Sequence, residues 1–265
     1  MPMQQMMQST PPPTPSCAQD ATFLVIGAGG LGAPLLLALG AAGARRLVIV
    51  DPDLVDESNL QRQVLYRTRD VGRPKVLAAK DALLRRWPGL SVEPVRARFD
   101  ETSARALAID ADVLCEGSDD PATKFLANDV AHALGRSVVI GGVLRHAGQV
   151  FPVRPGRDAC YRCLFESLPS GDAARCADAG VFGATCGEVG ALQARAALAL
   201  AGDPAHDALL GRVWLVEPGG TRKLTLRPRA GCTGCGAVES PAAEVSSMLA
   251  TTHSHFDTRV TATKA

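Results

Sequence analysis

Four of the eight cysteines in this chain have the spacing of a metal site. Cys160 and Cys163 form one C-x-x-C pair, and Cys232 and Cys235 form another after 68 intervening residues. Four thiolates satisfy the tetrahedral coordination that Zn²⁺ prefers and leave no open position for a substrate. The spacing therefore predicts a structural zinc site that ties the last ordered segment to the middle of the domain. Two buried or redox-active cysteine pairs are the alternative.

A glycine cluster follows the apolar run Phe23–Ile26 and fits the pattern G-x-G-x-x-G. Its glycines are Gly27, Gly29, Gly30 and Gly32. Glycines at this spacing allow a tight strand-to-helix turn and a close approach to a phosphate, which a helix N-terminus favours. Asp51 lies 24 residues beyond Gly27, after the next apolar run, where an acid can accept hydrogen bonds from ribose hydroxyls. The pattern predicts a nucleotide site, with a turn used only for packing as the alternative.

Polar and cationic residues follow Asp51, and they favour one kind of nucleotide chemistry. Arg62 lies in the polar stretch 51–63, and Lys75 lies where a helix is predicted to begin. An adenylating enzyme needs such cations because charge builds on the departing pyrophosphate. A hydride-transferring enzyme has no such requirement. Taken singly, either cation also fits a solvated surface residue.

Strand and helix patterns alternate over the first 140 residues. Strands are predicted at 23–26, 47–50, 92–95, 112–115 and 137–140, and helices at 31–42, 74–87 and 121–134. Alternation of this kind predicts an α/β fold with a Rossmann-like, mostly parallel sheet and helices on both faces. The helix at 74–87 is predicted to place Val76, Leu77, Leu83 and Leu84 on one side. Shorter strands, one Ala-rich helix at 188–201 and a C-terminal zinc-bound subregion complete the predicted fold.

Composition sets the expected domain limits and excludes several partners. We expect a disordered leader at 1–20, one domain at 21–239 and a disordered tail at 240–265. Within the domain, the nucleotide-binding half is expected at about 21–148 and the zinc-binding half at about 149–239. A formal charge of +1 and only 4% aromatic residues argue against a nucleic-acid or membrane-surface partner. The N-terminal region lacks the basic start and apolar run of a signal peptide, which predicts a cytoplasmic protein.

The order of these motifs resembles the ThiF/MoeB/HesA family, bacterial relatives of ubiquitin-activating enzymes. The resemblance covers about residues 21–237. Besides the glycine loop, it is carried by residues 58–63, 72–75, 141–149, 160–163, 176–181 and 190–194 and by the Cys232/Cys235 pair. It implies a nucleotidyltransferase, a sulfur-carrier protein adenylyltransferase that uses ATP with Mg²⁺ and contains structural Zn²⁺. Such an enzyme activates the C-terminal Gly-Gly carboxylate of a ubiquitin-like carrier as an acyl-adenylate and releases pyrophosphate.

The resemblance also implies roles for individual residues. Asp51 would hold the ribose, and the phosphates would be lined by Asn59, Arg62, Gln63 and Lys75. Asp119 falls on the family's Thr-Asp-Asn motif and would coordinate Mg²⁺. The motif reads Ser118-Asp119-Asp120 here, and Asp120 would bind metal or cap the following helix. The catalytic residues would be Arg62, Lys75, Asp119 and, as a covalent link to the carrier, Cys176.

The implied partners are a small ThiS- or MoaD-like sulfur-carrier protein and a second copy of the chain in a homodimer. No rhodanese-like extension follows Cys235, so a separate cysteine desulfurase or rhodanese is expected to donate sulfur. One family feature is missing, because the first arginine is Arg45 and no N-terminal arginine can reach the other subunit's site. Two alternatives remain open: a non-catalytic carrier-docking protein of the same fold and an NAD-dependent oxidoreductase.

Overall fold

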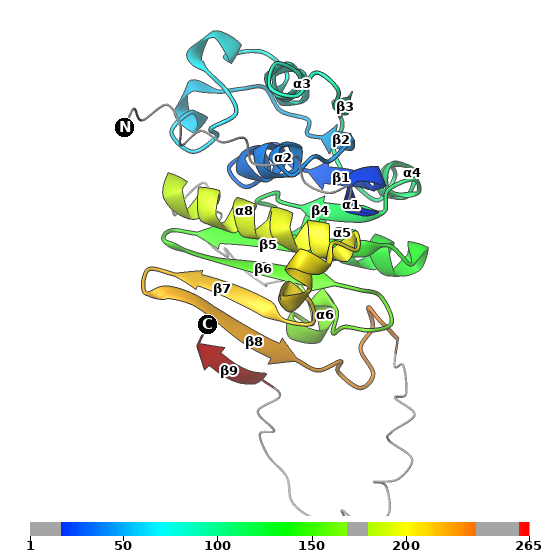
Figure 1. Ribbon diagram of the computed structural model, residues 1–265. Helices are drawn as coiled ribbons and strands as arrows, with labels where there is room; N and C mark the ends of the chain where they lie inside the picture. Colours follow the sequence, from blue (N-terminus) through cyan, green and yellow to red (C-terminus); the bar gives the residue numbers. More distant parts are fainter. Residues whose placement is uncertain (1–16, 169–179, 237–259, 265) are drawn as a thin grey trace, which may run out of the picture.

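A single mixed sheet forms the frame of the protein. The computed structural model describes residues 17–168, 180–236 and 260–264. Within these residues, nine strands are ordered β3-β2-β1-β4-β5-β6-β7-β8-β9 (Figure 1). The parallel half contains β1 (Thr22–Ile26), β2 (Arg46–Val50), β3 (Ser91–Val95), β4 (Val113–Glu116) and β5 (Ser137–Leu144). The antiparallel half adds β6 (Ala147–Val153), β7 (Val213–Glu217), β8 (Gly220–Leu226) and β9 (Val260–Lys264).

Helices cover both faces of this sheet. On one face lie α2 (Gly32–Ala41), α3 (Lys75–Leu84) and α8 (Gly183–Leu200), and Figure 1 shows α2 and α8 side by side. On the other lie α4 (Ala104–Ala108), α5 (Pro121–Leu134) and α6 (Tyr161–Leu164). Short elements connect them: α1 (Cys17–Asp20) and the 3₁₀ turns η2 (Glu57–Asn59), η3 (Thr68–Asp70) and η4 (Pro204–Leu209). The predicted Rossmann-like α/β class, with helices on both faces of the sheet, is confirmed.

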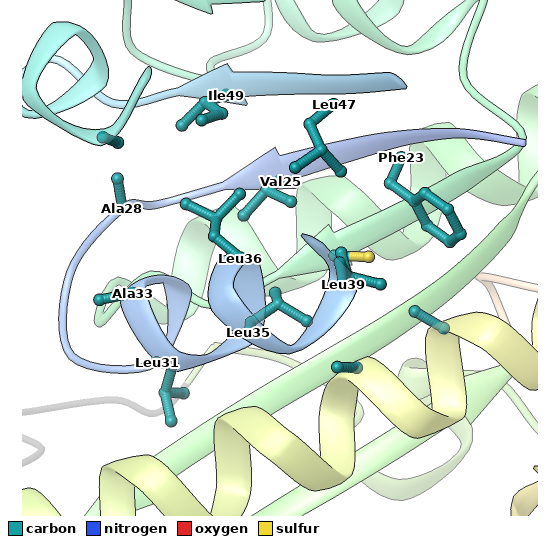
Figure 2. Packing of buried hydrophobic residues seen from close by; sticks show 14 of the residues in the cluster. Phe23, Val25, Ala28, Leu31, Ala33, Leu35, Leu36, Leu39, Leu47 and Ile49 are labelled. Carbon is teal, nitrogen blue, oxygen red and sulfur yellow. The ribbon is translucent and has the colours of Figure 1, made fainter. Parts of the chain in front are cut away.

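Alternate residues of the central strands build two hydrophobic cores. On β1, Phe23 and Val25 pack in the core under α2, whereas Leu24 and Ile26 pack in the core under α5. Figure 2 shows the first core, where Leu36 and Leu39 of α2 lie close to the side chains from β1. Side chains alternate across a strand, so a strand covered on both faces must be apolar at every position. This explains why the strands of the parallel half are short continuous apolar runs in the sequence.

Local signals define α5, the helix that begins at the mouth of the parallel sheet. The Asp120 side chain accepts hydrogen bonds from the N–H groups of Ala122 and Thr123, and Pro121 occupies the first helical turn. Gly135 ends the helix in the left-handed conformation with φ of 64°. These are the residues that helix termini favour, because they satisfy unpaired N–H groups or tolerate positive φ. The predicted capping role of Asp120 is confirmed.

The structure corrects several details of the sequence-based elements. Leu77 is 44% exposed, because the buried face of α3 instead contains Val76, Ala79 and Leu83, three and four residues apart. The Ala-rich helix begins at Gly183, five residues before its predicted start at 188. Helix α4 was not predicted, and a strand, β9, lies inside the segment predicted as a disordered tail. Helix α1 lies at the end of the predicted leader.

Among the described residues, none of the helices combines the length and apolar character needed to span a membrane. The uncharged stretch 23–44 has sufficient length, but it is divided between β1, the glycine turn and α2.

We predict that Leu36→Ala lowers the free energy of unfolding by about 2–5 kcal/mol, because Leu36 is fully buried between α2 and the sheet. The matched control is Leu77→Ala, at an exposed position on α3. Its effect should stay within about 0.5 kcal/mol. The measurement is urea unfolding of the parent and both variants. Their free energies of unfolding are compared with a common dependence on urea concentration. Equal destabilisation by both substitutions would contradict the packing described above.

Candidate active site and metal centre

A large cavity lies at the carboxyl ends of the parallel strands. Its volume is about 1030 Å³, and it opens where β1 lies between β2 and β4. Strand connections leave in opposite directions at this point, which is where open α/β sheets bind ligands. The lining includes nine of the predicted site residues: Gly27, Gly29, Gly30, Asp51, Asn59, Arg62, Gln63, Lys75 and Asp119.

The glycine turn joins β1 to α2 at the floor of this cavity. Gly27 has φ of 89°, and a Cβ there would lie 3.0 Å from the backbone nitrogen of Ser118. Gly32 does not line the cavity, and a Cβ on it would overlap the carbonyl group of Gly27. Gly27 and Gly32 therefore shape the turn, whereas Gly29 and Gly30 present backbone to the cavity beside the N-terminus of α2. That arrangement suits an anionic phosphate.

Asp51 is a buried carboxylate at the end of β2. One oxygen accepts a hydrogen bond from the N–H of Ala28 at 2.8 Å, and the other from the N–H of Asp53 at 2.9 Å. Desolvation raises the pKa of Asp51, although nearby Lys75 and the two N–H groups act in the opposite direction. Each carboxylate oxygen keeps a free lone pair toward the cavity, so Asp51 can still accept hydrogen bonds from ribose hydroxyls.

Lys75 lies beside Asp51 at the start of α3. Its Nζ is 2.9 Å from Oδ2 of Asp53 and 4.0 Å from Oδ1 of Asp51. The lysine side chain is buried, whereas Asp53 is largely exposed. The structure thus places this cation between two carboxylates at the Asp51 side of the cavity.

Arg62 lies in a separate polar cluster that follows η2. Its guanidinium donates to Oδ1 of Asn59 at 2.8 Å, and Nε2 of Gln63 donates to the same oxygen at 3.2 Å. Within the described residues Arg62 has no carboxylate partner, and the buried Oε1 of Gln63 has no hydrogen bond. A buried oxygen without a donor is costly in a folded protein, so this wall of the cavity fits a ligand that brings its own polar groups.

Asp119 lies on the loop between β4 and α5 and lines the same cavity as the Arg62 cluster. Its carboxylate is exposed and makes no hydrogen bond or ion pair with any residue in 17–168 or 180–236. Asp120, in contrast, caps α5. The structure therefore leaves Asp119, and not Asp120, as the acid that can meet a cation in the cavity.

Sequence reasoning missed a buried polar network below the Asp119 loop. Glu116 on β4 pairs with Lys124 on α5, with 2.7 Å between Oε2 and Nζ. Gln193 of α8 is fully buried and donates to the carbonyl oxygen of Glu116 at 2.6 Å. Glu116 ends an apolar run in the sequence, and a charged residue at such a position indicates a buried partner of opposite charge. The sequence does not identify which cation provides it.

The four C-x-x-C cysteines come together as predicted. Their sulfur atoms all lie within 4.8 Å of one another, and three of the pairs are 3.5–3.8 Å apart. Zn–S bonds of about 2.3 Å in a tetrahedron require sulfur atoms about 3.8 Å apart. All four are free thiols. Desolvation acts to raise the pKa of Cys232, but hydrogen bonds from the N–H groups of Cys235 and Gly234 and from the Cys160 and Cys163 thiols together lower it to about 7. Geometry and donor set both fit Zn²⁺.

Helix α5 connects this cysteine cluster to the cavity. Asn128 accepts a hydrogen bond from the N–H of Tyr161 at 2.8 Å, and Asp129 forms an ion pair with Arg162. Tyr161 begins α6 between Cys160 and Cys163, and it lines the cavity together with Phe165. A metal in the cluster would therefore also fix one wall of the cavity.

The remaining cysteines differ in their positions. Cys176, the predicted covalent residue, lies outside the described residues. Cys115 is fully buried in β4, where desolvation raises its pKa. Cys186 is buried near the start of α8 and lines the cavity beside Gly30.

A protein-family model with the description ThiF family matches residues 5–244 of this chain. A SAMP-activating enzyme E1 of Haloferax volcanii is 41% identical over 195 residues, which are 73% of this chain and 72% of that protein. A sulfur carrier protein adenylyltransferase of Thermus thermophilus is 40% identical over 227 residues, which are 82% of each protein.

Solved structures with the same fold include E. coli MccB with ATP, at 20% identity and a TM-score of 0.71. The match covers 83% of this chain and 68% of the MccB chain. At this identity the likeness shows the fold alone.

We predict that Cys232→Ser removes the metal that the cysteine cluster binds, because serine replaces one of four thiolate ligands. The melting temperature should fall by several degrees, since metal binding contributes folding free energy. Elemental analysis of freshly reduced protein measures zinc, with one ion per chain expected in the parent. Cys115→Ala is the matched control, because Cys115 lies in the core and not in the cluster. A parent protein without zinc would contradict the assignment.

Proposed function

Because the chain belongs to the ThiF family, we propose that it uses ATP to adenylate the C-terminal carboxylate of a small ubiquitin-like sulfur-carrier protein. In this reaction a carboxylate oxygen of the carrier's Gly-Gly end attacks the α-phosphorus of ATP. The bond between the α-phosphorus and its bridging oxygen breaks, and pyrophosphate leaves. The products are an acyl-adenylate and pyrophosphate.

One observation carries this proposal. A single cavity is lined by a glycine turn, the buried carboxylate of Asp51, the cations Lys75 and Arg62, and the unpaired carboxylate of Asp119. The attacking carboxylate is already ionised, so no protein nucleophile is needed. The difficulty is to bring two anions together, and positioned charges at the site relieve it.

Each of these residues has its own role in the proposed reaction. Asp51 holds the ribose, while the N-terminus of α2 and Lys75 face the α-phosphate region. Arg62 has no carboxylate partner within the described residues, so its charge is available to the departing pyrophosphate. Magnesium bound with ATP would be held by Asp119, and it would supply neutralising charge to the phosphates. Zinc in the cysteine cluster is proposed to be structural, because all four thiolates leave no open coordination position.

The names of the relatives support the same activity. The Thermus protein is a sulfur carrier protein adenylyltransferase, and both relatives align with more than two thirds of this chain. We further propose that the enzyme works as a homodimer and receives sulfur from a separate donor, either a cysteine desulfurase or a rhodanese. A covalent carrier link at Cys176 remains part of this proposal.

We predict that Arg62→Ala abolishes carrier-dependent exchange between ATP and pyrophosphate, with a loss of at least about 100-fold in rate. Arg62 lies at the cavity and bonds only to neutral oxygens, so its loss removes charge without breaking an ion pair. The assay uses labelled pyrophosphate and a carrier ending in Gly-Gly.

The matched control is Arg69→Ala, in the exposed turn η3 outside the cavity. It should retain the parent rate. Zinc content and melting temperature should be unchanged in both variants. An Arg62→Ala protein that exchanges pyrophosphate at the parent rate would remove Arg62 from the mechanism.

We also predict that the reaction requires the free carboxylate of the carrier and prefers ATP to NAD. A carrier with an amidated C-terminus cannot attack phosphorus, so exchange should fall to the level without carrier. Thermal-shift titration should show stabilisation by ATP with Mg²⁺ and none by NAD. Stabilisation by NAD alone would favour the oxidoreductase. Binding of ATP and carrier without exchange would favour a non-catalytic docking protein.

A further inference from the structure

A buried ion pair lies beneath the loop that carries Asp119. Glu116 is fully buried at the end of β4, and the Lys124 side chain is only 10% exposed. Desolvation raises the pKa of Glu116, while the charge and hydrogen bond of Lys124 act in the opposite direction. Buried ion pairs often stabilise a fold no better than apolar residues of the same size. The role of this ion pair therefore lies in the neighbouring groups to which it is hydrogen-bonded.

Both members of the pair hold Ser118, the residue before Asp119. Oε1 of Glu116 accepts hydrogen bonds from the N–H and the hydroxyl of Ser118, the first at 2.7 Å. Nζ of Lys124 donates to the carbonyl oxygen of Ser118 at 2.8 Å. One ion pair thus fixes Ser118 at its N–H, its side chain and its carbonyl.

A third hydrogen bond joins this loop to the facing wall of the cavity. Nζ of Lys124 donates to the carbonyl oxygen of Gly141 at 2.6 Å, and Gly142 next to it lines the cavity. Gln193 packs against Gly141 so closely that a Cβ there would overlap its side chain. An ammonium group has three hydrogens to donate, and here all three are used. Lys124 also lines the cavity, but because all three of its hydrogens are donated within the protein, it acts on a ligand through the backbone it holds.

We propose that the Glu116–Lys124 pair positions Asp119 for the magnesium ion bound with ATP. This inference rests on the function proposed above. The Asp119 side chain has no hydrogen bond or ion pair within the described residues, so the backbone at Ser118 sets where its carboxylate points. Magnesium accepts only near-ideal octahedral geometry, so a small displacement of this carboxylate weakens its coordination. Glu116 and Lys124 are positioning residues, and Asp119 is the residue that meets the metal.

The test measures ATP affinity by calorimetry, in magnesium-free buffer without chelator and with saturating Mg²⁺. In Lys124→Met, the affinity for ATP without Mg²⁺ should equal that of the parent. The gain in affinity on adding Mg²⁺ should shrink by about 10- to 100-fold. Asp119→Asn should show the same loss, and Lys124→Met/Asp119→Asn should lose no more than Asp119→Asn alone, because both changes act on one contact.

Two further variants keep the test decisive. Lys124→Met leaves Glu116 buried without its partner, so Glu116→Gln/Lys124→Met removes both charges and protects the fold. Lys80→Met on α3 is the matched control, since Lys80 does not line the cavity. It should match the parent in every measurement. Melting temperature and zinc content accompany each titration.

Three results would overturn the inference. The first is an unchanged effect of Mg²⁺ on ATP affinity in both Lys124 variants, and the second is an equal loss of ATP affinity with and without Mg²⁺. The third is a loss of ATP affinity from Lys124→Met that adds to the loss from Asp119→Asn. A different result would address the proposed function. If the parent and Lys80→Met bind no ATP under either condition, the adenylation proposal itself fails, and the positioning role fails with it.

Discussion

The hydrogen bond between the Ala28 N–H and the Asp51 carboxylate joins the ends of β1 and β2. Both strands are buried on both faces, so their ends can move little relative to each other. The bond carries this rigidity into the glycine turn, which the buried side chains of Ala28 and Leu31 and a hydrogen bond from the Tyr66 hydroxyl to the Ala28 carbonyl also hold in place. Burial of Asp51 costs desolvation free energy, and its two N–H partners and Lys75 offset part of that cost. The nucleotide site is thus preorganised by the strands, and the turn conformation follows from them.

Helix α5 extends the same frame from the cavity to the cysteine cluster. Its first turn carries the Asp120 cap and the buried Lys124, and its later turns carry Asn128 and Asp129. A rigid helix of 14 residues therefore fixes both the Asp119 loop and the segment that begins with Tyr161. Because Tyr161 lines the cavity, a metal bound by the cysteines would also fix the shape of that wall. Such a structural metal would support the proposed reaction without taking part in its chemistry.

The sequence predicts those parts of the fold whose signals are local. Continuous apolar runs predicted β1 and β2, and the residues Asp120, Pro121 and Gly135 predicted the limits of α5. Strand β8 was harder to predict, because its partly exposed residues are held mainly by backbone pairing with β7. Site residues followed the same rule. The cysteine cluster and cavity lining follow from motifs, whereas the Glu116–Lys124 pair depends on how α5 packs against β4, which no spacing reveals.

The charged residues that line the cavity differ in how far their charges are compensated within the protein. Lys75 lies between the carboxylates of Asp53 and Asp51, so its positive charge is already compensated within the protein. Arg62 bonds only to neutral oxygens, so its positive charge is uncompensated among the described residues. Asp119 also lines the cavity, and its carboxylate makes no ion pair within the described residues, so it would be the residue that holds a divalent cation bound with ATP. Under the function proposed above, the uncompensated charge of Arg62 would offset the negative charge that builds on the departing pyrophosphate. Lys75 is already paired and would contribute less to this, so the two cations have different electrostatic roles in the proposed adenylation.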